Sequence, residues 1–228
     1  MNTRGLLDQL LKSGQDLLQK KAGGKPSCIG GGQLGSLLGG AGGGALAAGA
    51  LGLLLGNKSA RKLGGKALTY GGLAALGVLA YKAYSNWQAN QPTAPQGEPR
   101  TLDRLPAPQA EQHSQAILKA LVAAAKADGH VDARERQLIE SELARLTDDP
   151  SLRGWLETEL NKPLDPSEVA RAATTPEMAA EMYLASVLMV DEEHFMERAY
   201  LDELARQMRL EPGLKAELEA QVRDAQVS

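Results

Sequence analysis

The pattern of apolar and polar positions divides the chain into four segments. Residues 1–28 set leucines among charged residues, and residues 29–87 are rich in glycine and poor in charge. Residues 88–108 are rich in proline, and residues 109–228 repeat apolar positions at helical spacing. No stretch shows the strict alternation of a half-buried strand. The pattern therefore predicts an all-α protein, in which a proline-rich linker precedes a C-terminal helical domain.

The C-terminal segment predicts six or seven short helices around one core. Its first helix carries an apolar stripe, and a later helix begins at Asp132 with its own core face. Asp149, Asp165, Thr175 and Glu211 each precede a proline, and this order is typical of a helix start. The stripe consists of Ala116, Ile117, Ala120, Leu121 and Ala124, and the later core face of Leu138, Ile139, Leu143 and Leu146.

The glycine-rich run from Ile29 to Gly56 has 28 residues without a charge, 12 of them glycine. It fits a membrane helix or a low-complexity tether. Two rows of small residues recur at every fourth position, and such rows allow close helix contacts in lipid. The rows favour the membrane helix, and they predict a homo-oligomer as well as membrane lipid as a partner. One row is Gly32, Ser36, Gly40, Gly44, Ala48, Gly52 and Gly56, and the other is Gly31, Gly35, Gly39, Gly43 and Ala47.

A second apolar segment, Ala67 to Tyr84, has 15 residues before its first charge at Lys82. Its tyrosines and the following Trp87 suit a membrane interface. Together with the glycine-rich run it predicts a glycine-zipper membrane hairpin over residues 29–87. The segment is short for a full crossing, so a helix lying at the interface is the alternative.

The N-terminal residues 1–28 predict an amphipathic helix. Leucines recur at helical spacing, and the helix either lies on a membrane or partner or packs as an ordinary helix. Asp8 and Asp16 interrupt the apolar positions, so the segment does not read as a secretory signal. The leucines are Leu7, Leu10, Leu11, Leu17 and Leu18.

Charge is distributed unevenly along the chain. Residues 1–105 hold 12 Lys and Arg against 4 Asp and Glu, whereas residues 106–228 hold 13 against 24. The basic half suits anionic lipid headgroups. The acidic half disfavours nucleic acid as a partner. Basic residues flank the glycine-rich run on both sides, so the positive-inside rule gives nearly a tie, and we expect the C-terminal domain to be cytoplasmic.

An acidic turn, Asp128 to Glu135, matches the second half of a calcium-binding EF-hand loop. Part of it recurs, because residues 127–146 resemble residues 190–208. The repeat adds two acids, so the predicted ligands of a divalent metal ion are Asp128, Glu135, Asp191 and Glu197, with His130 and His194 beside them. In the alternative interpretation, the Asp-Gly pair ends one helix and the acids cap the next.

The single cysteine, Cys28, excludes an internal disulfide.

The turn KADGHVDARE, its partner VDEEHFMERAYLDELA and the glycine-rich N-terminal half together resemble the YebE-like inner-membrane proteins. These proteins carry a C-terminal domain similar to the tellurite-resistance TerB fold. The resemblance implies a bacterial inner-membrane location and an all-α domain of paired repeats. It also implies metal binding by acids that match Asp128, Glu135, Asp191 and Glu197. The chain departs from the family in lacking a glycine after Asp191.

We therefore expect a membrane-anchored, non-enzymatic module whose acidic domain binds a divalent cation, a protein partner or both, in a role connected with stress or tellurite-type resistance. The alternative is a membrane scaffold assembled through the glycine rows, with the acidic domain as adaptor. A metal-dependent hydrolase is less favoured, because the sequence contains no nucleophile elbow, P-loop or HExxH motif.

Overall fold

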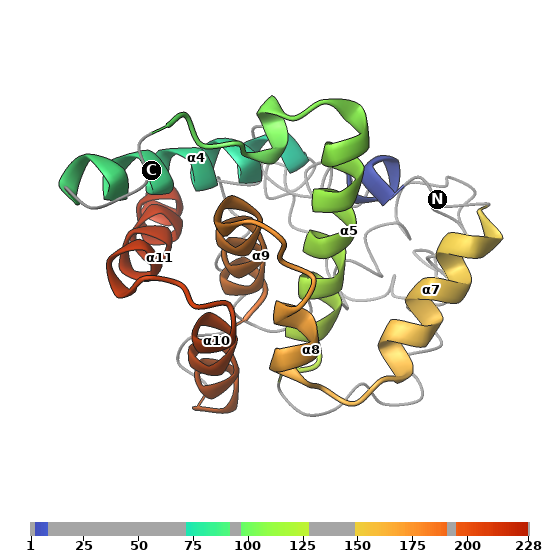
Figure 1. The fold of residues 1–228 in the computed structure, drawn as a ribbon. Helices are drawn as coiled ribbons and strands as arrows, with labels where there is room; N and C mark the ends of the chain where they lie inside the picture. The colour runs from blue at the N-terminus through green and yellow to red at the C-terminus, as the bar shows by residue number, and fades with distance from the viewer. Residues whose placement is uncertain (1–2, 9–71, 92–96, 128–148, 191–194, 228) are drawn as a thin grey trace, which may run out of the picture.

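The computed structural model describes residues 3–8, 72–91, 97–127, 149–190 and 195–227, and the regular elements in these ranges are helices (Figure 1). The all-α prediction is confirmed for this part of the chain. After a short helical segment at residues 3–8, the elements in order are α4 (Gly72–Asn90), the 3-10 helix η2 (Leu102–Arg104), α5 (Ala107–Ala124), α7 (Pro150–Asn161), α8 (Pro166–Ala170), α9 (Pro176–Met189), α10 (Phe195–Gln207) and α11 (Pro212–Val227).

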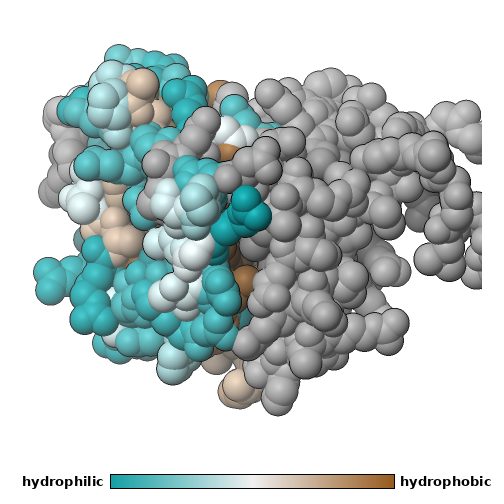
Figure 2. Space-filling model, turned by 90° about the vertical axis from the view of Figure 1, so that its right-hand side faces the viewer, coloured by the Kyte–Doolittle hydropathy of each residue, from teal (hydrophilic) through white to brown (hydrophobic). Residues whose placement is uncertain are grey.

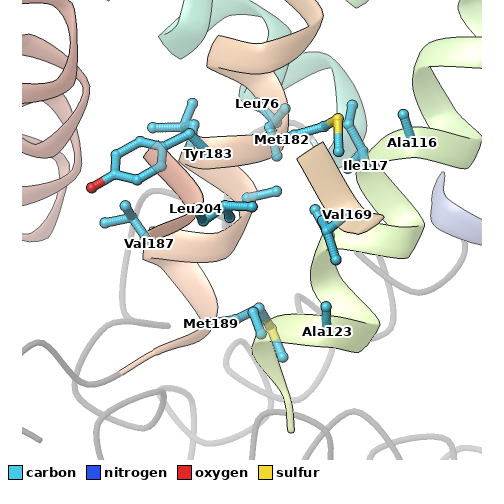
Figure 3. Close-up of a cluster of buried hydrophobic side chains, with 14 of the residues drawn as sticks. Leu76, Ala116, Ile117, Ala123, Val169, Met182, Tyr183, Val187, Met189 and Leu204 are labelled. Carbon is cyan, nitrogen blue, oxygen red and sulfur yellow. The ribbon is translucent and has the colours of Figure 1, made fainter. Parts of the chain in front are cut away.

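Helix α9 is the centre of the bundle, because α4, α5, α10 and α11 all pack against it (Figure 1). Every residue from Met178 to Val187 is buried. A helix that is buried on all sides needs an apolar sequence all round, and MAAEMYLASV meets this requirement with one charge, Glu181. In Figure 3, Met182, Tyr183 and Val187 of α9 lie among core side chains from α4, α5, α8 and α10.

The helix starts predicted at the four prolines are confirmed, whereas the start predicted at Asp132 lies outside the described residues. Asp149, Asp165 and Thr175 are the N-caps of α7, α8 and α9, and each side chain accepts a backbone N–H bond in the first turn of its helix. Helix α11 begins at Pro212, directly after Glu211. The predicted stripe of α5 is also inward-facing: its alanines and Ile117 are buried, and Leu121 is half-buried.

Helix α4 corrects the expectation for the second apolar segment. Its described residues pack against α9 and α11, and Leu76, Ala80, Ala83 and Tyr84 are buried in the same core as α9. The Arg104 guanidinium lies over the ring of Tyr81, with its Cζ atom 3.8 Å from the ring centroid. Tyr81, Tyr84 and Trp87, which suited a membrane interface, therefore contact protein, whereas Tyr70 lies outside the described residues.

The proline-rich segment was expected to be a spacer, but its described residues 97–106 lie against the bundle. Thr101 and Leu102 are buried, and η2 contacts both α4 and α5. The Leu102 N–H donates to Glu181 Oε1 at 2.5 Å, which joins this segment to the central helix. A backbone N–H that leaves water needs such an acceptor, and the buried carboxyl group supplies it.

The N-terminal residues 3–8 also belong to the bundle. Leu6 and Leu7 are buried in the common core. Glu111 of α5 accepts the first free N–H groups of the segment, from Thr3 at 2.5 Å and Arg4 at 3.2 Å. Of the two interpretations, this part of the chain fits an ordinary packed helix.

Among the described residues, no helix combines the length and hydrophobicity needed to cross a membrane. The glycine-rich run at 29–56, the acidic turn at 128–135 with the helix predicted to begin at Asp132, and residues 191–194 of the repeat lie outside these residues.

Candidate functional site

The predicted metal ligands are placed only in part. Glu197 lies in the first turn of α10 and is 1% exposed. Asp128, Glu135 and Asp191 lie outside the described residues, as do His130 and His194. Within the described ranges, no group of three or more His, Cys, Asp or Glu side chains is arranged to hold a metal ion. The proposed cluster therefore stays a prediction.

A histidine and a glutamate that the sequence analysis did not single out form a buried pair at the centre of the bundle. His113 of α5 is 4% exposed, and its Nδ1 lies 2.6 Å from Oε2 of the fully buried Glu181. Burial raises the pKa of Glu181, and the hydrogen bonds from His113 and from the Leu102 N–H oppose this rise. The pair connects α5, α9 and η2, so its first effect is structural.

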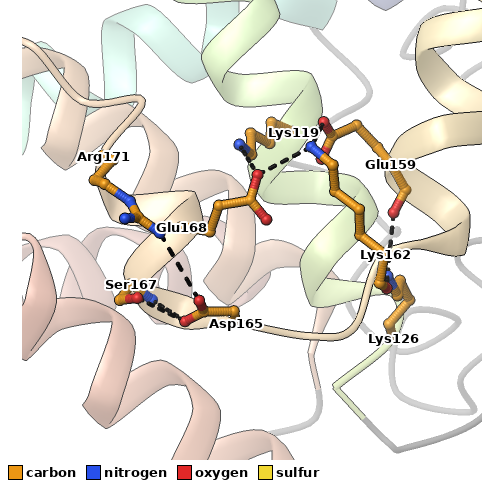
Figure 4. A network of polar contacts seen from close by, with 8 residues as sticks. All are labelled: Lys119, Lys126, Glu159, Lys162, Asp165, Ser167, Glu168 and Arg171. Atoms are coloured by element: carbon orange, nitrogen blue, oxygen red, sulfur yellow. Dashed lines mark hydrogen bonds and ion pairs between the residues drawn. The ribbon is translucent and has the colours of Figure 1, made fainter.

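A chain of lysines and glutamates joins α5, α7 and α8 (Figure 4). Glu168 accepts from Lys119 Nζ at 2.9 Å and from Lys162 Nζ at 3.0 Å, and these bonds lower its pKa. Lys162 also donates to Glu159 at 2.6 Å, and this bond raises the lysine pKa. Lys126 donates to backbone carbonyl groups at the end of α7. Because these lysines and acids are paired with one another, the network stabilises the packing of three helices.

A cleft of about 970 Å³ lies between α4, the α8–α9 connection and the α10–α11 connection. Its apolar lining includes Tyr84 and Trp87 of α4, whose rings meet edge to face at 5.2 Å. Leu210 and Leu214 line it from the opposite connection and from α11. This volume is at the upper end of the range for small-molecule sites, so the cleft is the best candidate for ligand binding.

Two arginines from different elements line this cleft, together with one acid, Glu211. Arg171 follows α8 and Arg209 follows α10, and both are exposed. Residues 106–228 carry 13 basic against 24 acidic side chains, so a cleft lining with more arginine than acid departs from its surroundings.

The backbone of Arg209 has a left-handed conformation, with φ at 54°. Its N–H donates to the Arg206 carbonyl at 3.1 Å, and the Leu210 N–H donates to the Ala205 carbonyl at 3.0 Å. These two bonds form a Schellman motif, in which glycine is the usual residue at the left-handed position. An arginine therefore occupies a position that favours glycine.

The other hollows formed by the described residues are smaller than this cleft. On the face shown in Figure 2, the coloured residues are mostly hydrophilic, with small separate hydrophobic patches. Phe195 and Met196 at the start of α10 are exposed apolar side chains, but they are two neighbouring residues beside a part of the chain that is not described. The cleft is the larger and chemically richer feature.

The sequence analysis missed the cleft because its residues are far apart in the chain. Trp87 was assigned to a membrane interface, and Arg171 and Arg209 have no motif around them. One local signal was present: the run MRLEPG contains a helix end and a helix start without a glycine between them. It indicates a left-handed residue other than glycine, but it gives no information on what faces it.

The family described as "Protein of unknown function (DUF533)" matches residues 40–222. The chain belongs to this family. A Yersinia enterocolitica relative, described as an uncharacterized protein in the ampR 5′ region, is 31% identical over 118 residues, or 52% of this chain and 85% of the relative. No solved structure matches the chain. The DUF533 match includes α4, the proline-rich segment and the bundle up to Val222, and so it agrees with their packing as one unit.

Proposed function

We propose that this DUF533 chain is a non-enzymatic binding module held at a bacterial inner membrane by its glycine-rich run. The observation that supports this proposal is the position of the two flanks of the run. Leu6 and Leu7 before it and Leu76 after it are buried in one core. A run that leaves and rejoins the same bundle, and that enters lipid between these points, enters and leaves on the same side.

The length and charge of the run fit this arrangement. Its 28 uncharged residues exceed the roughly 20 needed for one helical crossing, but they are too few for two. We therefore propose insertion from one side without a full crossing. The basic residues on both sides then lie at the same membrane surface, where anionic headgroups attract them. If both basic flanks lie on one side of the membrane, the positive-inside rule places them and the bundle on the cytoplasmic side.

We also propose that the chain is a YebE-like protein whose C-terminal domain is similar to TerB. The DUF533 match supports a family that includes residues 40–56 of the glycine-rich run together with the bundle. The resemblance to YebE-like proteins adds an inner-membrane location, and the resemblance to TerB adds a role in stress or tellurite-type resistance. The buried His113, paired with Glu181, favours a structural role for this histidine over general acid–base chemistry.

Membrane attachment is tested by fractionation of lysed cells. We expect the full-length chain in the high-speed pellet, from which detergent releases it and high salt does not. Replacing Leu37 and Leu54 with glutamate in the glycine-rich run is expected to move the chain to the supernatant, because charges inside lipid are costly. The matched control is Val78→Glu, because Val78 is exposed on α4 and α4 packs on protein. A full-length chain found entirely in the supernatant without detergent contradicts the proposal.

We further propose that the acidic domain has a binding partner. Glu197 is a buried carboxylate at the start of α10, and Asp128 and Asp191 directly follow described residues in sequence. Glu135 lies farther on, within the undescribed range 128–148. We propose that these acids bind a divalent cation or form part of a protein contact. Calorimetric titration of the full-length chain with Ca²⁺, Mg²⁺, Mn²⁺ and Zn²⁺ tests the metal version. We expect binding heat that is lost in the double variant Asp128→Ala, Asp191→Ala. No heat with the native chain, or equal heat with the variant, contradicts it.

A further inference from the structure

The cleft between α4, the α8–α9 connection and the α10–α11 connection is lined by two aromatic residues and two arginines. Trp87 lies with its ring edge close to Gly213, such that a Cβ atom at this glycine would be 3.3 Å from Trp87 Cδ1. The apolar surface of the cleft is thus contributed by two helices that are held together. An apolar ligand body placed on this surface would be partly removed from water.

The arginines give the cleft a preference for charge. Arg171 has a side chain that is 72% exposed, and its ion pair with Asp165 is long, at 3.9 Å. A pair at this distance and exposure contributes little, so Arg171 can turn towards a ligand at small cost. Guanidinium groups match the geometry of carboxylate and phosphate oxygens, because they offer paired N–H donors.

The backbone conformation of Arg209 is the observation that most favours a binding role for the cleft. Its left-handed φ of 54° is unfavourable for a side chain with a Cβ atom, and glycine would satisfy the same Schellman hydrogen bonds without strain. Residues held in such conformations cluster at functional sites, where the side chain has a use that offsets the strain. Here the residue in the left-handed conformation is an arginine that lines the cleft.

We propose that this cleft binds a small organic anion with an apolar body. The carboxylate or phosphate head would contact Arg171 and Arg209, and the body would lie against Tyr84, Trp87 and Leu214. This site is separate from the predicted metal ligands and does not depend on membrane attachment.

Trp87 provides a reporter for the test. The chain contains two tryptophans, so Trp155→Phe leaves Trp87 as the single emitter. The full-length Trp155→Phe chain is titrated with 4-cyclohexylbutanoate, with 4-cyclohexylbutyl phosphate and with the neutral alcohol 4-cyclohexylbutanol, none of which absorbs where tryptophan does. We expect a saturable change in Trp87 emission with both anions, and at least tenfold weaker binding of the alcohol. No saturable change, or equal affinity for the alcohol, overturns the proposal.

Variants at Arg209 separate a binding role from a structural one. Arg209→Gly is expected to raise the melting temperature, because it relieves the strained conformation, and to weaken anion binding at least tenfold. Arg209→Lys is expected to retain part of the affinity, since it keeps the charge and loses the paired donors. The control is Arg223→Gly, an exposed arginine of α11 outside the cleft, for which we expect unchanged affinity. An Arg209→Gly chain that binds the anions as tightly as its parent overturns the proposal.

Discussion

Single residues of this bundle show how a local conformation is set by what lies across from it. Gly77 of α4 and Gly154 of α7 are both helical glycines. A Cβ atom at Gly77 would lie 2.8 Å from Asp103 Oδ1 and 3.0 Å from the Asp103 backbone nitrogen, whereas one at Gly154 would have no neighbour within 4 Å. The first glycine is therefore required for close packing of η2 on α4, and the second is not.

These two glycines give opposite predictions for the same substitution. We expect Gly77→Ala to lower the free energy of unfolding by about 1–2 kcal/mol, because η2 has to shift. We expect Gly154→Ala to raise it by about 1 kcal/mol, through the better helix propensity of alanine. Urea denaturation of both variants checks this pair. Equal effects of the two substitutions would show that the contact with Asp103 does not limit position 77.

The buried carboxyl group of Glu181 predicts a pH dependence of stability. Burial raises its pKa above the unfolded value of about 4.3, so folding takes up a proton between the two pKa values. The free energy of unfolding therefore falls as the pH rises from the unfolded pKa through the folded pKa. Glu181→Gln cannot ionise and still offers an acceptor to the Leu102 N–H. We expect its stability relative to the parent chain to increase as the pH rises through this window.

Glu203 provides the opposite case for comparison. The hydrogen bond from Arg206 lowers the pKa of Glu203 to about 2. The contribution of ionised Glu203 to the free energy of unfolding is therefore present above the unfolded pKa and is lost as the pH falls. In Glu203→Gln, the difference from the parent chain should therefore decline below a pH of about 4, not above it. Denaturation curves measured across both ranges distinguish the two residues. A Glu181→Gln curve parallel to that of the parent chain would contradict the role of burial.

At the scale of elements, α4 and the segment before α5 are parts of the bundle. The apolar side of α4 is buried by α9 and α11, and Asn86 donates to Glu217 of α11 at 2.8 Å. The segment at 97–106 satisfies Glu181 through the Leu102 N–H. Removing both would expose the surface of α9 that they cover and leave the buried carboxyl with one partner fewer.

This arrangement predicts where a stable fragment begins. We expect residues 72–228 to unfold cooperatively, and residues 109–228 to be much less stable, because the second fragment loses the buried leucine, alanines and tyrosine of α4. Thermal unfolding followed by circular dichroism checks both fragments, which equally lack residues 3–8. A fragment 109–228 as stable as 72–228 would contradict this expectation and support the domain boundary at 109 that the sequence pattern predicts.

At the scale of the whole molecule, the packed flanks of the glycine-rich run give the proposed membrane attachment its geometry. The N-terminal residues 3–8 and α4 meet the same core, although 63 residues lie between them in the chain (9–71). The bundle therefore lies on the side from which the run would enter lipid. The basic flanks of the run would then face the lipid surface, where anionic headgroups attract them.

The sequence by itself determined the helical class of the described residues and the helix starts at Pro150, Pro166, Pro176 and Pro212. Apolar spacing and the Asp-Pro and Thr-Pro pairs are local, because a cap accepts an N–H from a residue two or three positions away. It also determined the inward face of α5, since helical spacing places Ala116, Ile117 and Ala120 on one side. Membership of α4 in the bundle was not determined in this way. An apolar segment of its length suits lipid or a protein core equally, and only the complementary surfaces of α9 and α11 decide between them.

The tertiary structure alone decided the candidate ligand site. Tyr84 and Trp87 belong to α4, whereas Arg171 follows α8 and Arg209 follows α10, and these three parts of the chain meet only through the packing of the helices. The pairing of His113 with Glu181 is likewise a contact across 68 positions. Such contacts depend on how helices cross, and the crossing is set by many side chains together, so no single spacing in the chain predicts them.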